Sequence, residues 1–222
     1  MKQTIISRFL AVALMMTTGN LAANAGWTDN LSPYDLNAPL GWATVDGYVT
    51  GGEGGTKVTV TNKTELMNAL KGTDKKIIYV DGEIEFSGLT NVKSVQNKTI
   101  IGMKGAAFVN SKHSASVSET GIMQLSSCKN IILRNIIFKS AGAYDIDGND
   151  NLTIIGSTYI WVDHCDFQDG VDGNFDCVNG SDNICVTWCR FRYLIAPWAG
   201  GSGGYNDHRN CDLWGNSDKR SG

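Results

Sequence analysis

Five aspartates fall within residues 161–176, a segment that reads WVDHCDFQDGVDGNFD and contains no lysine or arginine. They are Asp163, Asp166, Asp169, Asp172 and Asp176. Carboxylates at this density are either left in water or assembled around a cation. The segment therefore raises the hypothesis of a metal site. The alternative is that these aspartates only solvate turns, since Asp-Gly is ordinary turn chemistry.

The charge balance argues against two classes of partner. The 222 residues include 22 acidic and 19 basic side chains, which gives a net charge of −3. Because an acidic protein repels nucleic acid and anionic membrane surfaces, we expect neither as a partner. We expect no membrane span either, since no apolar stretch is long enough to cross about 30 Å of hydrocarbon. An anionic substrate would need a cation to bridge it.

The first residues are typical of an exported protein. Lys2 and Arg8 form a basic region, Phe9–Met16 is a short apolar run, and Ala23-Asn24-Ala25 is an A-x-A cleavage site. We therefore predict a signal peptide at 1–25, a linker at 26–40 and a folded domain at 41–222. The protein is expected to be secreted or periplasmic, and monomeric.

Three nine-residue segments superpose on one another. They are NIILRNIIF (Asn130–Phe138), YIWVDHCDF (Tyr159–Phe167) and NICVTWCRF (Asn183–Phe191), with isoleucine second and phenylalanine ninth in each. Apolar positions are two apart within each half, and this parity breaks between positions four and seven, which indicates a bend between two short strands. Weaker half-copies occur at 97–102 and 211–213.

A repeat of this length made of short strands and polar turns predicts a solenoid. A leucine-rich repeat is the alternative, but the sequence has no L-x-x-L-x-L series. We predict an all-β right-handed parallel β-helix with inward ladders of phenylalanine and cysteine. Cys165, Cys189 and Cys211 share one inward column and are expected to be buried thiols, because parallel Cβ vectors suit a disulfide poorly. The state of Cys128, Cys177 and Cys185 stays open.

Residues 61–72, TNKTELMNALKG, predict one short helix before the coils. A capping residue precedes apolar positions at helical spacing (Leu66, Ala69 and Leu70), and Gly72 ends the segment. Because an exposed end of a β-helix invites aggregation, we expect this helix to cap it.

The sequence resembles the pectate lyase family. The segments that carry the resemblance are GWATVDGYVTGGEGGTKVTVTN (41–62), IIYVDGEI, YIWVDHCDF with the family's W-[IV]-D-H motif, and DGNFDCVNGSDNICVTWCRF. The resemblance covers roughly residues 40–220. It implies a right-handed parallel β-helix that cleaves polygalacturonate by β-elimination and uses Ca²⁺.

The resemblance also gives the acidic segment a purpose. The family's calcium ligands map onto Asp150, Asp172 and Asp176, while Asp147 aligns less cleanly as a fourth. If Leu152 and Ile154 stack under Phe175 and Cys177, these three carboxylates converge from two coils. Oxygen ligands of this kind suit Ca²⁺ rather than zinc. Asp163 and His164 are expected to belong to a structural network beside the site.

The sequence departs from the family pattern in two places. The family's catalytic arginine lies in an R-x-P stretch, which does not occur here. We therefore expect the chain to be truncated, with carboxy-terminal coils missing and the catalytic residue beyond Gly222. A substrate-binding lysine is expected roughly at Ile195. Arg190 and Arg192 flank the inward Phe191 and point outward, so either could compensate or simply be solvated.

Three functions follow from these observations. The first is a calcium-dependent pectate lyase, or its amino-terminal part, acting on polygalacturonate. The alternative is a non-catalytic β-helix that binds pectin or serves in the cell envelope, which the missing arginine and Ile195 favour. A pectin lyase that acts without calcium is disfavoured, because that branch lacks the acidic trio.

Overall fold

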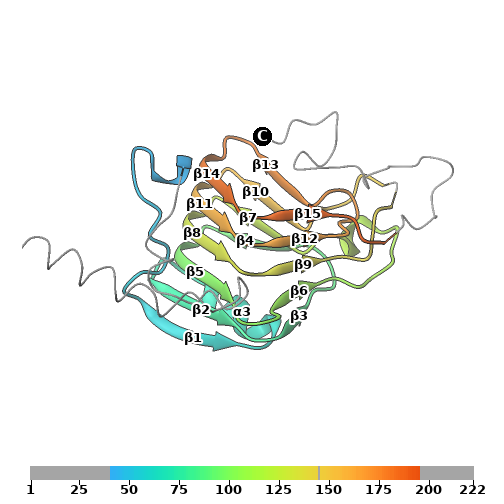
Figure 1. Ribbon diagram of the computed structural model, residues 1–222, viewed down its shortest axis with the longest axis horizontal. Coiled ribbons are helices and arrows are strands. Elements are labelled where there is room, and N and C mark those ends of the chain that lie inside the picture. The colour runs from blue at the N-terminus through green and yellow to red at the C-terminus, as the bar shows by residue number, and fades with distance from the viewer. Residues whose placement is uncertain (1–40, 145, 196–222) are drawn as a thin grey trace, which may run out of the picture.

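The computed structural model describes residues 41–144 and 146–195. Its strands form three sheets that run along a stack of coils, and every strand pair is parallel (Figure 1). Each strand pairs with its counterpart one coil away, which is the arrangement of a parallel β-helix. The predicted all-β solenoid is thereby confirmed.

The three sheets have the following members in chain order. Sheet A contains β1 (Thr56–Val60), β2 (Lys76–Val80), β5 (Gln96–Gly102), β8 (Lys129–Arg134), β11 (Thr158–Asp163) and β14 (Asp182–Thr187). Sheet B contains β3 (Glu83–Glu85), β6 (Ala107–Val109), β9 (Ile137–Lys139), β12 (Asp166–Gln168) and β15 (Arg190–Arg192). Sheet C contains β4 (Thr90–Lys93), β7 (Met123–Ser126), β10 (Leu152–Ile155) and β13 (Phe175–Val178).

The three predicted repeats lie in register on neighbouring coils. Ile160 of β11 pairs with Ile131 of β8 and with Ile184 of β14. The ninth residues stack in the same way, and a ladder of rings runs through the core with centroids 5.4, 5.3, 4.8 and 5.0 Å apart. In order, its members are Phe86, Phe108, Phe138, Phe167 and Phe191. The half-copy at 97–102 is β5, and the one at 211–213 lies outside the described residues.

The bend inside each repeat has a specific backbone cause. The sixth residues, Asn135, His164 and Trp188, have φ angles of 59°, 51° and 54°. This left-handed conformation reverses the side-chain parity between sheet A and sheet B, and side chains other than glycine and asparagine adopt it at a cost. The first residues of the repeats also have positive φ.

The described cysteines are all free thiols. Cys165 and Cys189 occupy one inward column, where the backbone N–H of Cys165 donates to the Cys189 sulfur over 3.4 Å. The hydrogen bond with Cys165, together with burial, raises the pKa of the Cys189 thiol. Cys165 is therefore a buried thiol, as predicted, whereas Cys189 is a free thiol of intermediate burial. Cys211 lies outside the described residues.

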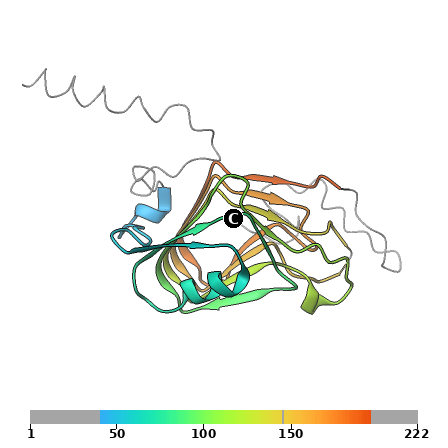
Figure 2. The same cartoon turned by 90° about the horizontal axis from the view of Figure 1, so that it is seen from below.

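The predicted capping helix is α3 (Lys63–Leu70), and it covers the end of the coils at β1 (Figure 2). Asn62 caps it by accepting a hydrogen bond from the Glu65 N–H over 3.0 Å, while the Glu65 carboxylate accepts one from the Thr61 N–H. This pair differs from a capping box only in that the Glu65 carboxylate reaches the N–H of the residue before the cap. Leu66 and Leu70 are buried against the first coils. In the described part of the chain, no helix is long and apolar enough to cross a membrane.

Residues 41–52 form a strap along the outer face of sheet A (Figure 1). Ala43 and Val49 of the strap are buried against Ile132 and Trp161. The strap contacts one coil after another through the first residues of the repeats. In chain order, Val45 O accepts from Asn183, Asp46 O accepts from Tyr159, and the N–H groups of Thr50 and Gly51 donate to Asn130. This packing explains the glycine-rich opening, because a Cβ on Gly52 would lie 1.9 Å from the carbonyl oxygen of Lys76.

Lys98 is a fully buried lysine at the start of β5. Its ammonium donates to the carbonyl oxygens of Gly72 and Gln96 over 3.1 and 2.8 Å and to that of Asp74. These bonds fix the turn that leads from α3 into β2.

Replacing Lys98 by methionine keeps the volume and removes the donor, so three carbonyl groups each lose a hydrogen bond. We expect Lys98→Met to lower the free energy of unfolding by about 3 kcal/mol. Urea denaturation would measure the change, with the exposed Lys93→Met as the matched control. Equal stability of the two variants would contradict a structural role for this ammonium.

Candidate active site

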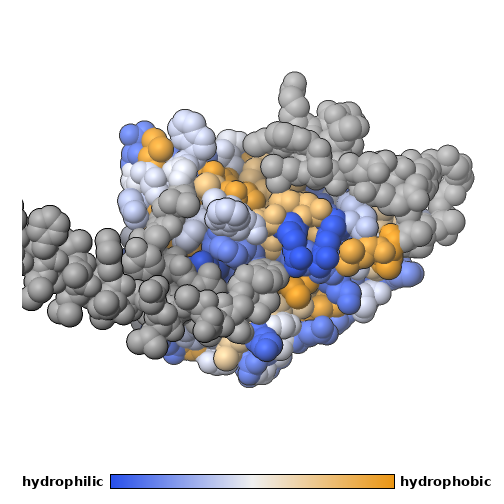
Figure 3. Space-filling view, viewed as in Figure 1, coloured by the Kyte–Doolittle hydropathy of each residue, from blue (hydrophilic) through white to orange (hydrophobic). Residues whose placement is uncertain are grey.

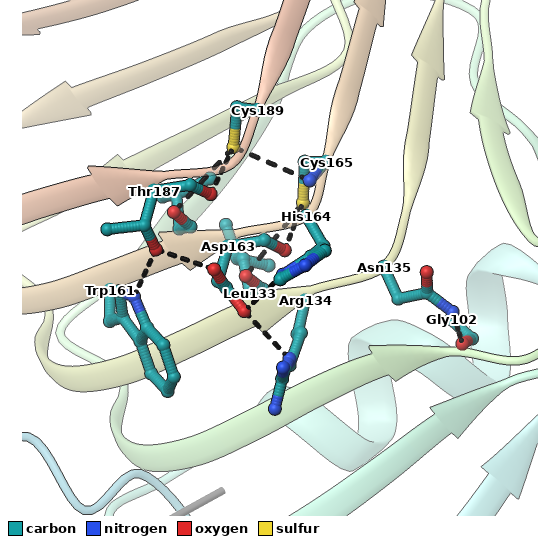
Figure 4. Close-up of polar contacts among 11 residues, drawn as sticks. Gly102, Leu133, Arg134, Asn135, Trp161, Asp163, His164, Cys165, Thr187 and Cys189 are labelled. Carbon is teal, nitrogen blue, oxygen red and sulfur yellow. Dashed lines mark hydrogen bonds and ion pairs between the residues drawn. The ribbon is translucent and has the colours of Figure 1, made fainter. Parts of the chain in front are cut away.

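Asp163 is the centre of a buried network that joins three coils (Figure 4). Arg134 Nε lies 2.8 Å and His164 Nδ1 lies 2.7 Å from one oxygen of this carboxylate. Thr187 Oγ1 donates to the other oxygen over 2.5 Å and accepts from Trp161 Nε1 over 2.7 Å. The W-x-D-H motif thus holds β8, β11 and β14 together from outside. Its carboxylate is engaged with structural partners.

Asp166 is neutralised by two arginines on the next coil. Its carboxylate accepts from Arg190 Nη2 over 2.9 Å, from Arg192 Nε over 3.0 Å, and from Arg192 Nη2. Gln168 Nε2 adds a fourth bond over 2.9 Å. The arginines point outward, as predicted, because Phe191 between them stacks on Phe167 in the core.

Asp169 is satisfied by backbone groups. Its Oδ1 accepts from the N–H of Leu194 over 2.6 Å and from that of Ile195 over 3.1 Å. Three of the five aspartates therefore have structural roles, each with a different kind of partner. The two that remain, Asp172 and Asp176, lie near another carboxylate.

Asp172 and Asp176 lie close to Asp150, which ends the loop before β10. The register is the predicted one, since Leu152 pairs with Phe175 and Ile154 pairs with Cys177. Burial, followed by the carboxylates of Asp176 and Asp172, raises the pKa of Asp150 to about 8. The structure thus brings these three predicted residues together. Asp147 is exposed and is not among the carboxylates that raise this pKa.

Asp150 is held in place by the chain around it. Its carboxylate accepts from Thr153 Oγ1 over 3.3 Å and from the backbone N–H of Gly173. A Cβ on Gly173 would lie 2.4 Å from Asp150 Oδ1, so only glycine allows this approach. Residue 173 therefore brings the loop before β13 directly onto the carboxylate before β10.

A buried amide network holds the same two loops together. Asn151 Nδ2 donates to Asn174 Oδ1 and to the carbonyl oxygen of Gln168, both over 2.8 Å. Asn151 Oδ1 accepts from Ser140 Oγ over 2.6 Å, and Asn174 Oδ1 also accepts from the Gly170 N–H. Sequence reasoning missed these amides and the contact of Gly173, because the loops differ in length and carry no repeat. It could have found the pairing of Arg190 with Asp166, since both occupy position eight of their repeats.

The donor set of the acidic trio can be compared with what a metal requires. Within residues 41–144 and 146–195, no three His, Cys, Asp or Glu side chains are close enough to enclose an ion in this conformation. The trio nevertheless offers only carboxylate oxygens, which are the ligands that Ca²⁺ prefers. A cation there would also remove the repulsion that raises the pKa of Asp150. Cys177 adds no thiolate, because burial, assisted by Asp176, raises its pKa to about 12.

The fold and the acidic loops define a parallel β-helix with a carboxylate site, and comparison with known proteins identifies its family. The chain belongs to the pectate lyase family, whose model, described as pectate lyase, matches residues 13–190. A pectate trisaccharide-lyase of Thermotoga maritima is 32% identical over 195 residues, covering 82% of this chain and 46% of that protein. Pectate lyase plyB of Emericella nidulans is 31% identical over 180 residues, covering 78% of this chain and 49% of that protein. The chain thus spans about half the length of the curated relatives it matches.

Solved structures agree on the fold. A pectate lyase bound to a hexasaccharide matches with a TM-score of 0.55 and 21% identity, covering 71% of this chain and 60% of that one. The fold is a right-handed parallel β-helix, as predicted.

The raised pKa of Asp150 predicts a dependence of stability on pH. The folded state prefers the protonated carboxyl, so this contribution to stability is fully present below about pH 4 and is lost as the pH rises through about 8. With a chelator present, Asp150→Asn should therefore gain stability relative to the parent protein between these values, by up to about 5 kcal/mol. Urea denaturation at several pH values would measure the difference. A constant difference across this range would show that Asp150 does not titrate abnormally.

Proposed function

We propose that the chain is the calcium-binding part of a pectate lyase that cleaves polygalacturonate by β-elimination. The observation that carries the proposal is that Asp150, before β10, lies near Asp172, in the loop before β13, and Asp176, on β13, whose carboxylates add to burial in raising its pKa. Membership of the pectate lyase family supports it. In the same proposal, polygalacturonate is the partner, and the protein is monomeric and secreted or periplasmic. The predicted signal peptide at 1–25 lies outside the described residues.

β-Elimination from a uronate needs removal of the C5 proton, stabilisation of the resulting carbanion and departure of the oxygen at C4. Bound Ca²⁺ would supply the second requirement as a Lewis acid at the uronate carboxylate. Asp150, Asp172 and Asp176 are the residues proposed to hold it. Thr153 and the Gly173 N–H orient Asp150 for this task. The amides of Asn151 and Asn174 keep the two loops in contact.

A second candidate function depends on whether the chain contains the base that removes the C5 proton. No R-x-P stretch occurs in the 222 residues, and the position expected for a substrate-binding lysine holds Ile195. An isoleucine cannot pair with a uronate carboxylate. These two observations favour calcium-dependent binding of pectin without cleavage as the second candidate.

The metal can be tested separately from the reaction. A ligand that binds only the folded state stabilises it by mass action, so Ca²⁺ should raise the thermal midpoint of the protein relative to chelator. Asp176→Asn should lose most of this shift, because it removes one charged ligand. Asp182→Asn, on the exposed start of β14, should retain the full shift. Identical melting curves with Ca²⁺ and with chelator would refute the calcium site.

The reaction can be followed directly, because elimination creates an unsaturated uronate that absorbs ultraviolet light. The protein is mixed with polygalacturonate in Ca²⁺ or chelator, and absorbance and binding are both recorded. Absorbance that rises only with Ca²⁺ supports the lyase. Calcium-dependent binding without absorbance supports the second candidate, and neither signal would reject both.

A further inference from the structure

We infer that the outer surface formed by Trp188, Arg190 and Arg192 is a second binding site for an acidic polysaccharide, separate from the carboxylate trio. The identity of the polymer, a polyuronate, rests on the proposed function. The surface lies on the bend after β14 and on β15. The trio instead lies at the entrances to β10 and β13 of sheet C, with Asp176 on β13 itself.

The surface consists of an exposed row supported by a row on the coil below. Arg190 pairs in register with Asp166, and Arg192 pairs with Gln168. Trp188 lies against His164, with ring centroids 6.3 Å apart and planes 30° apart. The supporting row is much less exposed than the row above it. The parallel register therefore aligns Trp188, Arg190 and Arg192 along one edge and holds each from beneath.

The two arginines carry more positive charge than Asp166 requires. This carboxylate is 1% exposed, and one guanidinium would balance its charge. The side chains of Arg190 and Arg192 are nevertheless 52% and 36% exposed. Arg190 donates to Asp166 through Nη2, and Arg192 donates to it through Nε and Nη2. Figure 3 shows the resulting strongly hydrophilic surface over β12 and β15.

Other charges on the same sheet reinforce this polarity. Lys139 of β9 lies in register below Gln168 and so continues the column of Arg192. Apart from the buried Asp166, the acidic side chains of sheet B are Glu83 and Glu85, which lie on β3 at its far end. The upper part of sheet B is thus a basic surface on an acidic protein. A basic surface of this kind attracts a polyanion.

Trp188 adds a feature that simple charge neutralisation does not require. Its ring is 76% exposed, and its backbone has a φ of 54°, where asparagine and histidine occupy the same position on the coils below. A large aromatic side chain in this place presents a flat apolar face to water. Such a face suits the C–H side of a sugar ring, while a guanidinium suits a carboxylate through paired N–H donors. A polyuronate offers both groups on every residue.

Binding of oligogalacturonate to the full chain in the presence of chelator tests the inference, because the carboxylate trio then contributes no cation. Calorimetry should show binding by the parent protein and none to a neutral galactan oligosaccharide. Arg190→Gln with Arg192→Gln should weaken binding at least tenfold, and Trp188→Ala should weaken it several-fold. Lys57→Gln removes an exposed charge on β1 and should bind as the parent does. No binding by the parent, or unchanged binding by the arginine variant, would overturn the inference.

Loss of both arginines leaves the buried Asp166 without its counter-charges, so the double variant could unfold. A triple variant that also carries Asp166→Asn removes the charges together and should fold and still bind weakly. Arg190→Lys with Arg192→Lys keeps the charge but loses paired donation, and it should bind with intermediate affinity. If either of these folded variants binds as tightly as the parent, the inference is wrong.

The calcium site and the arginine surface can each be refuted without the other. Asp176→Asn should lose most of the calcium effect and leave binding in chelator unchanged. If Asp176→Asn is silent but the arginine variants lose binding, the calcium site is wrong and this surface stands. The reverse pattern would retain the calcium site and reject the surface.

Discussion

In-register parallel pairing sets each side chain about 4.8 Å from its counterpart on the neighbouring coil. At that spacing, like side chains meet like positions in columns that run the length of the molecule. Aromatic rings gain from this, and the ladder from Phe86 to Phe191 fills the core. Carboxylates do not gain, because two of them at this distance repel each other. Every column that contains a carboxylate therefore needs a counter-charge or a hydrogen-bond donor.

Neighbouring coils supply most of these counter-charges and donors. Asp163 stands between Arg134 on one side and Thr187 on the other, and Asp166 lies beneath Arg190. Each carboxylate is thus matched by a residue one coil away at the same position of the repeat. Asp150 and Asp176 differ from these: Asp176 pairs in register with Thr153, whose hydroxyl donates to Asp150, and burial, followed by the carboxylates of Asp176 and Asp172, raises the pKa of Asp150. The repulsion between these carboxylates of neighbouring coils is what a bound cation would relieve.

The same rule explains what the sequence could and could not predict. Columns of Ile, Phe and Cys repeat in the sequence, so the register of Ile131, Ile160 and Ile184 was predictable, and so was the approach of Asp150 to Asp172. The left-handed conformations of Tyr159 and Trp188 were not, because neither residue favours them. The contacts of Gly173 and Asn174 were also missed, since they arise in loops that have no counterpart on other coils. Residues in the repeating strands could therefore be placed from the sequence. The loop contacts that hold the site together could not.

The strap at residues 41–52 changes how such a stack can evolve. It touches the coils of β14, β11, β8 and β5 in turn through Asn183, Tyr159, Asn130 and Thr99. A solenoid without such a tie can gain or lose a coil by duplication, because each coil contacts only its neighbours. Here the strap has a fixed length matched to a fixed number of coils. Insertion of a coil between β5 and β14 would shift the contacts beyond it out of register, so the number of coils in this span is fixed by a segment that belongs to none of them.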